Sequence, residues 1–222
     1  MWGTPPHPPK NSILIIVRED FKYTNSDPVS MASLSLEHFK LLHKEGVQLI
    51  DSRPTNAFAS SFISNSINAS LNGSFEYMAS CIFNKEEHLV IICEDGKDSE
   101  SLLRLESEGF REMSTFNFDL WDGESFSIGR IKAFEAQNYI EVMKDVSNSE
   151  DWEVLHVKSV ENTPLMDLVE DYSNISKGDV LYCGNGHKSM AAASFLKTKE
   201  VDVKDIIGGL SAMLVDAPEL EI

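Results

Sequence analysis

The sequence predicts an α/β fold of two tandem domains, each with a central, mainly parallel sheet flanked by helices. Short apolar runs alternate with helical patterns along the chain, which is typical of parallel-sheet units. The order of strand, cysteine loop and helix also occurs twice, at residues 91–108 and 180–197. In both copies a glycine follows the cysteine by three residues and a serine follows it by six. This repetition indicates two copies of one domain.

Composition excludes several classes of function. The chain has 222 residues, with 36 acidic and 19 basic side chains and a net charge of −17, which argues against binding to nucleic acid or anionic membranes. Three scattered cysteines and six histidines form no disulfide framework and no metal-ligand spacing, so we expect no metal and no cofactor. The apolar run 13–17 is far shorter than the about 18 residues of a membrane span and lacks a cleavage site. We expect a soluble, cytoplasmic protein with reduced thiols.

The first copy is assigned element by element. Residues 1–30 are expected to be an extended lead-in, because residues 1–11 contain four of the eight prolines. A helix over 36–44 follows, with either Ser33 or Ser35 as its N-cap and Gly46 at its end. The remaining elements of a domain over 31–127 are strands at 47–51, 67–69 and 89–93 and helices at 56–61, 75–83 and 99–108. Cys81, within the predicted helix 75–83, is interpreted as a core residue.

The second copy is predicted over 151–222, after a linker or connecting helix at 128–150. The apolar run 154–158 aligns in sequence with 49–53 of the first copy. This alignment sets His156 and Lys158 at the positions of Asp51 and Arg53. On this alignment 42 positions separate Asp51 from the first loop cysteine, but only 27 separate His156 from the second. The second domain is therefore expected to be shortened by about 15 residues, a helix with its turn.

The cysteine loop of the second copy carries the predicted chemistry. It comprises Cys183, Gly184, Asn185, Gly186, His187, Lys188 and Ser189, between a buried strand and a helix. Ligands of α/β sheets bind at the carboxyl ends of strands. Two glycines let the backbone N–H groups turn inward as an anion-binding nest, and the helix N-terminus adds positive potential. With Lys188 and His187 nearby, these groups favour the thiolate form of Cys183, a nucleophile.

These residues resemble a known family. The loop 183–189 is similar to the C-x-x-G-x-R-S active-site loop of rhodanese sulfurtransferases, and residues 208–213 resemble the family's closing GG-x-x-A-W, with Met213 in place of the aromatic residue. Asp51 and Arg53 match the family's D-x-R strand end, and residues 58–68 match the following motif loosely. The tandem arrangement over about 34–215 is similar to rhodanese pairs that follow metallo-β-lactamase-type persulfide dioxygenase domains, although the metal motif of such a domain is lacking here.

The resemblance implies a sulfurtransferase. A sulfane-sulfur donor would convert Cys183 to a persulfide held by the loop amides and Lys188, and a thiol acceptor, small molecule or protein, would remove the sulfur. The overall acidity favours a protein-bound or neutral donor over free thiosulfate. Lys188 lies five residues after Cys183, the spacing of sulfurtransferase loops, whereas phosphatase relatives have a loop one residue longer. Phosphate ester hydrolysis is therefore disfavoured.

The loop of the first copy is expected to be a degenerate site. It contains Cys93, Gly96, Lys97 and Asp98 beside the predicted strand end with Asp51 and Arg53. Three carboxylates over 94–98 oppose a thiolate, and Asp98 takes the place of the cation.

Two hypotheses remain. In the first, Cys183 is the nucleophile of a sulfurtransferase. In the second, both sites are catalytically inactive and the tandem module serves docking or regulation in sulfur metabolism.

Overall fold

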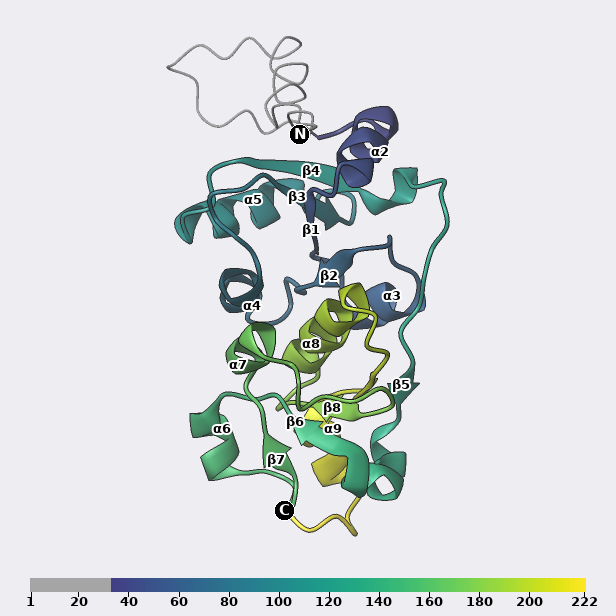
Figure 1. Cartoon of the computed structure of the whole chain (residues 1–222), viewed down its shortest axis with the longest axis vertical. Helices are drawn as coiled ribbons and strands as arrows, with labels where there is room; N and C mark the ends of the chain where they lie inside the picture. The colour runs from purple at the N-terminus through teal and green to yellow at the C-terminus, as the bar shows by residue number, and fades with distance from the viewer. Residues whose placement is uncertain (1–32) are drawn as a thin grey trace, which may run out of the picture. The chain divides into compact units, whose positions relative to one another are not determined.

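The structure is a computed structural model that describes residues 33–222 (Figure 1). The predicted lead-in 1–30 and the apolar run 13–17 lie outside the described residues. Among residues 33–222, no helix combines the length and apolar character that a membrane crossing requires.

The first domain is built on a four-stranded, all-parallel sheet. Its order is β2-β1-β3-β4, and the strands are β1 (Gln48–Asp51), β2 (Ser66–Asn68), β3 (Leu89–Cys93) and β4 (Met113–Asn117). Its helices are α2 (Leu36–Lys44), α3 (Thr55–Ser60), α4 (Phe75–Ile82), α5 (Asp98–Ser107) and the 3₁₀ turn η1 (Phe118–Leu120). Ser35 is the residue that caps α2, because its side chain accepts the N–H of His38.

Successive side chains along each strand point to opposite faces of this sheet. Leu49 and Val90 pack with Phe39 of α2 on one face. Ile50 and Ile91 point to the other face and join a cluster that includes apolar residues of α3, α4 and α5. A parallel sheet buried on both faces explains the nearly continuous apolar run of β3.

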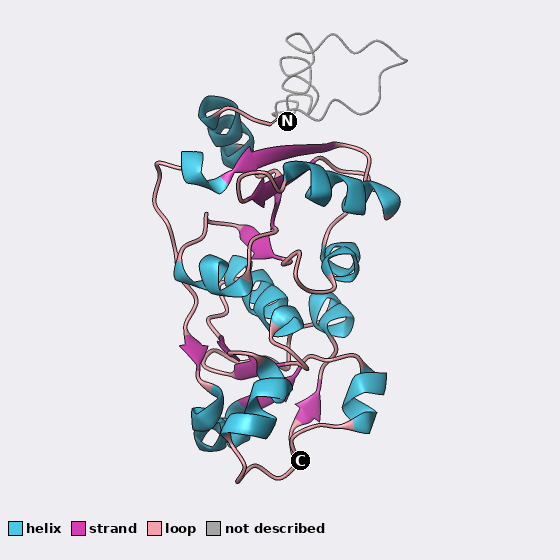
Figure 2. Ribbon diagram, turned by 180° about the vertical axis from the view of Figure 1, so that it is seen from behind, coloured by secondary structure: helices cyan, strands magenta, loops and turns pink. Residues whose placement is uncertain are grey.

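The second domain has a five-stranded parallel sheet of order β5-β9-β8-β6-β7. Figure 2 shows its short strands in magenta between cyan helices. The strands are β5 (Arg130–Ile131), β6 (Met143–Asp145), β7 (Glu161–Asn162), β8 (Val180–Tyr182) and β9 (Lys204–Ile206). The helices are the 3₁₀ segment η2 (Ala133–Val142), α6 (Ser149–Val154), α7 (Leu165–Glu170), α8 (His187–Thr198) and α9 (Gly209–Asp216). Apolar residues of η2 and α9 cover one face of the sheet, and those of α7 and α8 cover the other.

The prediction of two α/β domains is confirmed, but three details of the second domain are wrong. Residues 128–150 are not a linker, because β5, η2 and β6 belong to the second sheet. Residues 154–158 are not its paired strand, because Val154 ends α6 and β6 occupies that place. The second domain is not shortened by a helix, because α6 and α7 both lie between β6 and β8.

The two domains share a continuous apolar core. The cluster on the inner face of the first sheet includes residues of α7 and α8 as well as α3 and α4. Small residues at 191–194 are buried, and they bring α8 close to β2, the edge strand of the first sheet. There the Asn68 N–H donates to the Ser194 hydroxyl at 2.9 Å. The helix that follows the Cys183 loop therefore also covers the edge of the first sheet.

Candidate functional site

The end of β1 holds a buried ion pair. Asp51 is inaccessible to solvent and Arg53 is nearly so, and the Arg53 side chain donates to both Asp51 carboxylate oxygens. The Arg53 backbone N–H also donates to Asp51, and its guanidinium carbon lies 3.3 Å from the centroid of the Phe118 ring. Burial raises the pKa of Asp51, while the contacts with Arg53 act in the opposite direction. These contacts hold Arg53 against the carboxylate and the ring.

The equivalent strand end of the second domain is β6, with Asp145 in the position of Asp51. The Ser147 N–H donates to Asp145 as the Arg53 N–H does to Asp51. In both domains the side chain of an asparagine 17 residues later, Asn68 or Asn162, donates to the carbonyl of the aspartate. The expectation that His156 and Lys158 replace Asp51 and Arg53 is therefore wrong, because Asp145 and Ser147 do. The shared spacing from aspartate to asparagine is the sequence signal that identifies this pair.

Cys93 stands at the end of β3 in an unfavourable setting for a thiolate. Its side chain is almost fully buried, and its thiol donates to the Phe116 carbonyl at 3.8 Å. Burial, followed by the negative charges of Asp98, Asp51, Asp95 and Glu94, raises the pKa of Cys93 to about 12. Lys97 adds no cation at the sulfur, because its ammonium pairs with Glu100 on the exposed start of α5.

Cys183 follows β8 and has a different surrounding. The Gly186 N–H donates to its sulfur at 3.2 Å, and the thiol donates to the Ser189 hydroxyl at 3.8 Å. Gly186 has φ +83°, a left-handed conformation that turns this N–H into the loop. Gly184 and Asn185 are exposed, but Cys183 itself is only 1% exposed.

The Gly208-Gly209 turn closes the Cys183 loop from the other side. The Leu210 N–H donates to the Cys183 carbonyl at 2.8 Å, and the Ser211 N–H donates to the Gly184 carbonyl at 2.9 Å. A Cβ atom on Gly209 would lie 2.0 Å from the Cys183 carbonyl oxygen and 2.8 Å from the Gly186 nitrogen. The loop backbone thus requires a glycine at this position, which explains the second glycine of the pair.

The side chains of Lys188 and His187 contact groups other than the Cys183 sulfur. The Lys188 ammonium lies 3.3 Å from a carboxylate oxygen of Asp151 in α6 and 5.4 Å from the ring centroid of Tyr77 in α4. The His187 ring packs against Gly73 in the first domain. Burial, and secondarily the charge of Arg130, lower the pKa of His187. Neither side chain has a hydrogen bond to Cys183 among residues 33–222.

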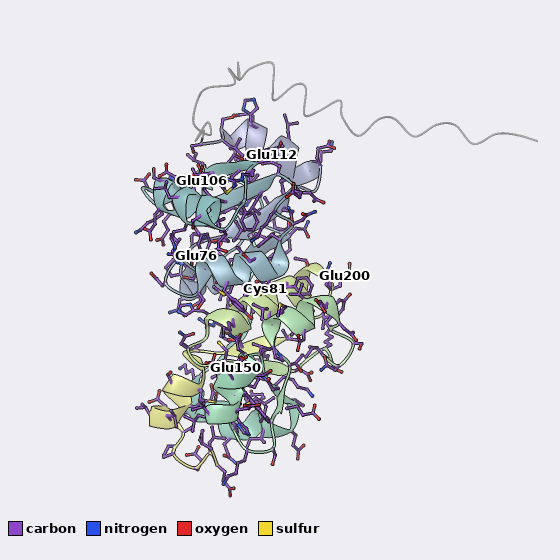
Figure 3. The ribbon with its side chains drawn as sticks, turned by 90° about the vertical axis from the view of Figure 1, so that its left-hand side faces the viewer. Glu76, Cys81, Glu106, Glu112, Glu150 and Glu200 are labelled. Carbon is purple, nitrogen blue, oxygen red and sulfur yellow. The ribbon has the colours of Figure 1, made fainter. Side chains whose placement is uncertain are left out.

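Cys81 lies on α4 and packs partly buried against the shared core (Figure 3). Burial raises its pKa, while Tyr77 and the charge of Lys188 act in the opposite direction. The Tyr77 hydroxyl itself donates to Asn148 of the second domain at 2.9 Å. This cysteine therefore lies beside the contacts of Lys188 and outside both cysteine loops.

Two paired residues of the second sheet were not predicted from the sequence. Asp205 of β9 is fully buried, and both its carboxylate oxygens accept hydrogen bonds at 2.7 Å from Arg130 of β5. Arg130 also donates to Asn56 of α3 in the first domain. The two residues are 75 positions apart and meet only because β5 and β9 pair, so no local pattern reveals them.

Comparisons with known proteins agree with this architecture. The family model described as rhodanese-like domain matches residues 36–118 and 131–215. No curated protein matches the chain. The second match of the family model begins in β5, within the segment 128–150 that was expected to be a linker.

Several solved structures also match parts of the chain at low sequence identity. CoADR-RHD from Bacillus anthracis is 22% identical, with a TM-score of 0.40 over 43% of this chain and 18% of its own. A rhodanese-related protein from Thermoplasma volcanium is 20% identical, with a TM-score of 0.35 over 40% of this chain and 93% of its own. A thiosulfate sulfurtransferase from Pseudomonas aeruginosa is 17% identical, with a TM-score of 0.35 over 86% of this chain and 40% of its own. The chain thus spans less than half the length of the first and third of these proteins.

Proposed function

Because this chain belongs to the rhodanese-like domain family, with two family domains over residues 36–118 and 131–215, we propose that it is a sulfurtransferase with its nucleophile at Cys183. The Cys183 thiolate attacks the outer sulfur of a sulfane donor R–S–SH. The donor S–S bond breaks, R–S⁻ leaves with the electron pair, and the outer sulfur keeps its proton in the Cys183 persulfide, Cys–S–SH. An acceptor thiolate then attacks the outer sulfur of the Cys183 persulfide, which regenerates the Cys183 thiolate. The two exchanges involve no net oxidation.

The observation that carries the proposal is the hydrogen bond from the Gly186 N–H to the Cys183 sulfur at 3.2 Å. A backbone donor directed at sulfur favours a thiolate or a persulfide anion at that atom. Gly184, Asn185, Gly186 and Ser189 complete the active-site loop in this proposal. Lys188 and His187 belong to the loop by sequence, but they act at the boundary with the first domain. The first domain contributes the degenerate loop around Cys93.

The direct test compares two matched variants, Cys183→Ser and Cys93→Ser, in an assay of sulfur transfer from a low-molecular-weight persulfide to a thiol acceptor. We expect Cys183→Ser to abolish transfer and Cys93→Ser to retain it. Full transfer by Cys183→Ser would contradict the proposal. Cys93 ends a buried strand, Cys183 directly follows one, and both are nearly fully buried, so the substitutions impose comparable structural costs.

A second candidate function is a catalytically inactive module for docking or regulation in sulfur metabolism. It is favoured by the 1% exposure of Cys183 and by the direction of Lys188, which pairs with Asp151 instead of the sulfur. Under this hypothesis no persulfide forms on Cys183, and its reaction with iodoacetamide at neutral pH is no faster than that of a free thiol. Under the sulfurtransferase proposal the persulfide forms.

The donor and the acceptor are defined here only by their chemistry, sulfane sulfur and thiol. Persulfide transfer requires reduced thiols, and we place the protein in the cytoplasm for that reason.

A further inference from the structure

A cavity of about 280 Å³ lies at the amino ends of the strands of the second sheet. Its walls come from the turn before β8, the end of α8, the start of β9 and the segment that leads from the first domain to β5. Cys183 follows β8, and therefore lies at the opposite, carboxyl ends of these parallel strands. The cavity is thus separate from the site of the proposed function.

Three lysines and one carboxylate line this cavity. The lysines are Lys177 before β8, Lys197 on α8 and Lys204 on β9, and the carboxylate is that of Asp202. The Lys197 ammonium forms an ion pair with one Asp202 oxygen, and the Lys177 ammonium lies 3.8 Å from the other. No carboxylate among residues 33–222 pairs with the Lys204 ammonium, which lies 6.0 Å from the ring centroid of Tyr139.

The cavity therefore has a surplus of positive charge. The hydrogen bond from Lys197 lowers the pKa of Asp202 below its usual value, so this carboxylate is charged at neutral pH. Three ammonium groups against one carboxylate leave two positive charges uncompensated. Such a surplus is unexpected in a chain with 36 acidic and 19 basic side chains. Like charges around one cavity repel each other, and a bound dianion would remove this repulsion.

Backbone contacts hold the lysine-bearing segments around the cavity. The Gly178 N–H donates to the Asp202 carbonyl at 2.8 Å, which ties the turn with Lys177 to the wall that contains Asp202. The side chain of Lys204 lies along Gly129, because a Cβ atom on that glycine would lie 3.4 Å from Lys204 Cγ and 3.7 Å from its Cε. The three lysines therefore approach the cavity from different walls.

The floor of the cavity is apolar. Ile128, Ala193 and Val203 line it, and all three are buried members of the core that the two domains share. The Ile128 N–H donates to the Ala59 carbonyl of α3 at 2.9 Å, which fixes this part of the floor to the first domain. Small-molecule sites usually have volumes of about 300–1,000 Å³, so this cavity suits a ligand at the small end of that range.

We propose that this cavity binds a small molecule with a doubly charged phosphate group, held by Lys177, Lys197 and Lys204. Lysine ammonium groups bind phosphate oxygens as point charges, and the surplus of two positive charges matches the charge of a phosphate monoester. The organic part of the ligand packs on the apolar floor. Binding involves no atom of Cys183, so this site does not depend on the proposed function.

Isothermal titration calorimetry at constant ionic strength tests the site, with inorganic phosphate and glycerol 3-phosphate as the probes. A pH of about 8 keeps both probes doubly charged. We expect one saturable site per chain for both probes and tighter binding of glycerol 3-phosphate, because it also contacts the floor. Equal affinities would overturn the role of the floor, and absence of binding by both probes at millimolar concentration would overturn the site.

The matched variants are Lys177→Gln, Lys204→Gln and Lys199→Gln, each of which removes one exposed positive charge. Lys199 does not line the cavity, and its ammonium lies 5.2 Å from the ring centroid of Phe195. We expect about tenfold weaker binding in Lys177→Gln and in Lys204→Gln, because each loses a charged contact with the phosphate. Lys199→Gln should change the affinity less than about twofold. Equal weakening in all three variants would show nonspecific attraction and overturn the proposal.

Two further variants test the charge balance and the location. Asp202→Asn raises the surplus from two positive charges to three and should tighten binding several-fold, a gain that a loss of structure would not produce. Weaker binding in this variant would contradict the charge balance. Lys188→Met removes the cation of the Cys183 loop and should leave the affinity unchanged. Loss of binding in Lys188→Met would place the phosphate at that loop and overturn the proposal.

Discussion

The two cysteine loops occupy equivalent places in two copies of one fold, yet they offer their sulfur atoms opposite surroundings. Cys93 faces four carboxylates, and its thiol donates to a backbone carbonyl. Cys183 accepts an N–H from Gly186, and its thiol donates to the Ser189 hydroxyl. The strand and helix frame is therefore not sufficient for a reactive thiol, because the frame is the same in both domains. The difference is made by the charge of each loop and by the polar groups that contact each sulfur.

The aspartates that end β1 and β6 differ in a complementary way. Asp51 is neutralised by Arg53, whereas Asp145 has Ser147 at that position and lies beside the Tyr182 hydroxyl. Burial and the charge of Asp145 both raise the pKa of Tyr182, so this hydroxyl stays protonated. The first domain thus has an ion pair at this strand end, while the second has a backbone N–H that donates to its cysteine sulfur.

The largest expected effect concerns the reactivity of Cys93. Because its pKa is raised to about 12, only a small fraction is thiolate at pH 8, and alkylation should be roughly 10³-fold slower than for an ordinary cysteine. The rate should rise about tenfold per pH unit from pH 7 to 9 without a plateau. Peptide mass spectrometry after timed iodoacetamide treatment measures this. A Cys93 rate equal to that of a free thiol would remove the distinction between the two loops.

The next effect concerns the ion pair of the first domain. Arg53→Ala leaves the Asp51 carboxylate buried without its partner and should lower the free energy of unfolding by about 3–5 kcal/mol. The matched variant Ser147→Ala removes a side chain whose backbone N–H already holds Asp145, and should cost less than about 1 kcal/mol. Denaturant unfolding compares the two. Similar losses in both variants would show that the strand ends do not differ as described.

The third effect concerns the stability cost of replacing a glycine near each cysteine loop. Gly209→Ala directs a Cβ at the Cys183 carbonyl in a left-handed conformation, and the combined overpacking and strain should cost roughly 2–5 kcal/mol. Gly96 is also left-handed, but an added Cβ meets nothing within 4 Å, so Gly96→Ala should cost only about 1–2 kcal/mol. The melting temperatures of both variants provide the test. A Gly209→Ala protein no less stable than Gly96→Ala would contradict the tight closure of the Cys183 loop.

The smallest effect is expected at Lys188. Its ammonium contacts Asp151 and the Tyr77 ring, so Lys188→Met should cost about 1 kcal/mol or less in stability. The alkylation rate of Cys183 should change less than about twofold, because no hydrogen bond joins Lys188 to the sulfur. A tenfold slower rate would instead return Lys188 to the role that the sequence suggests.

Local patterns predicted most elements of the first domain but not β4, and the reasons for the successes are physical. The continuous apolar run of β3 and the capped helix α2 are strong signals, and both elements have the predicted bounds. In the second domain the apolar run at 154–158 was misleading, because Val154 is 83% exposed at the end of α6. The true strand β6 contains a lysine and an aspartate in three residues, and β5 has only two residues, so neither resembles a buried strand in sequence.

The candidate site was likewise predicted from the sequence only in part. The glycine and cysteine spacing of loop 183–189 identifies residues that do lie around the sulfur. The direction of Lys188 could not be predicted, because a residue in the first turn of a helix can face the loop or a neighbouring helix. Asp205 and Arg130 were also beyond prediction, since they meet through strand pairing across 75 positions.

We propose that sulfur is carried on the loop of Cys183 and not on the loop of Cys93. Treatment with a low-molecular-weight persulfide, followed by peptide mapping, tests it most directly. We expect one additional sulfur, about 32 Da, on the peptide containing Cys183, removed again by a thiol, and no such addition on the peptide containing Cys93. An unmodified Cys183, or a persulfide on Cys93, would contradict it.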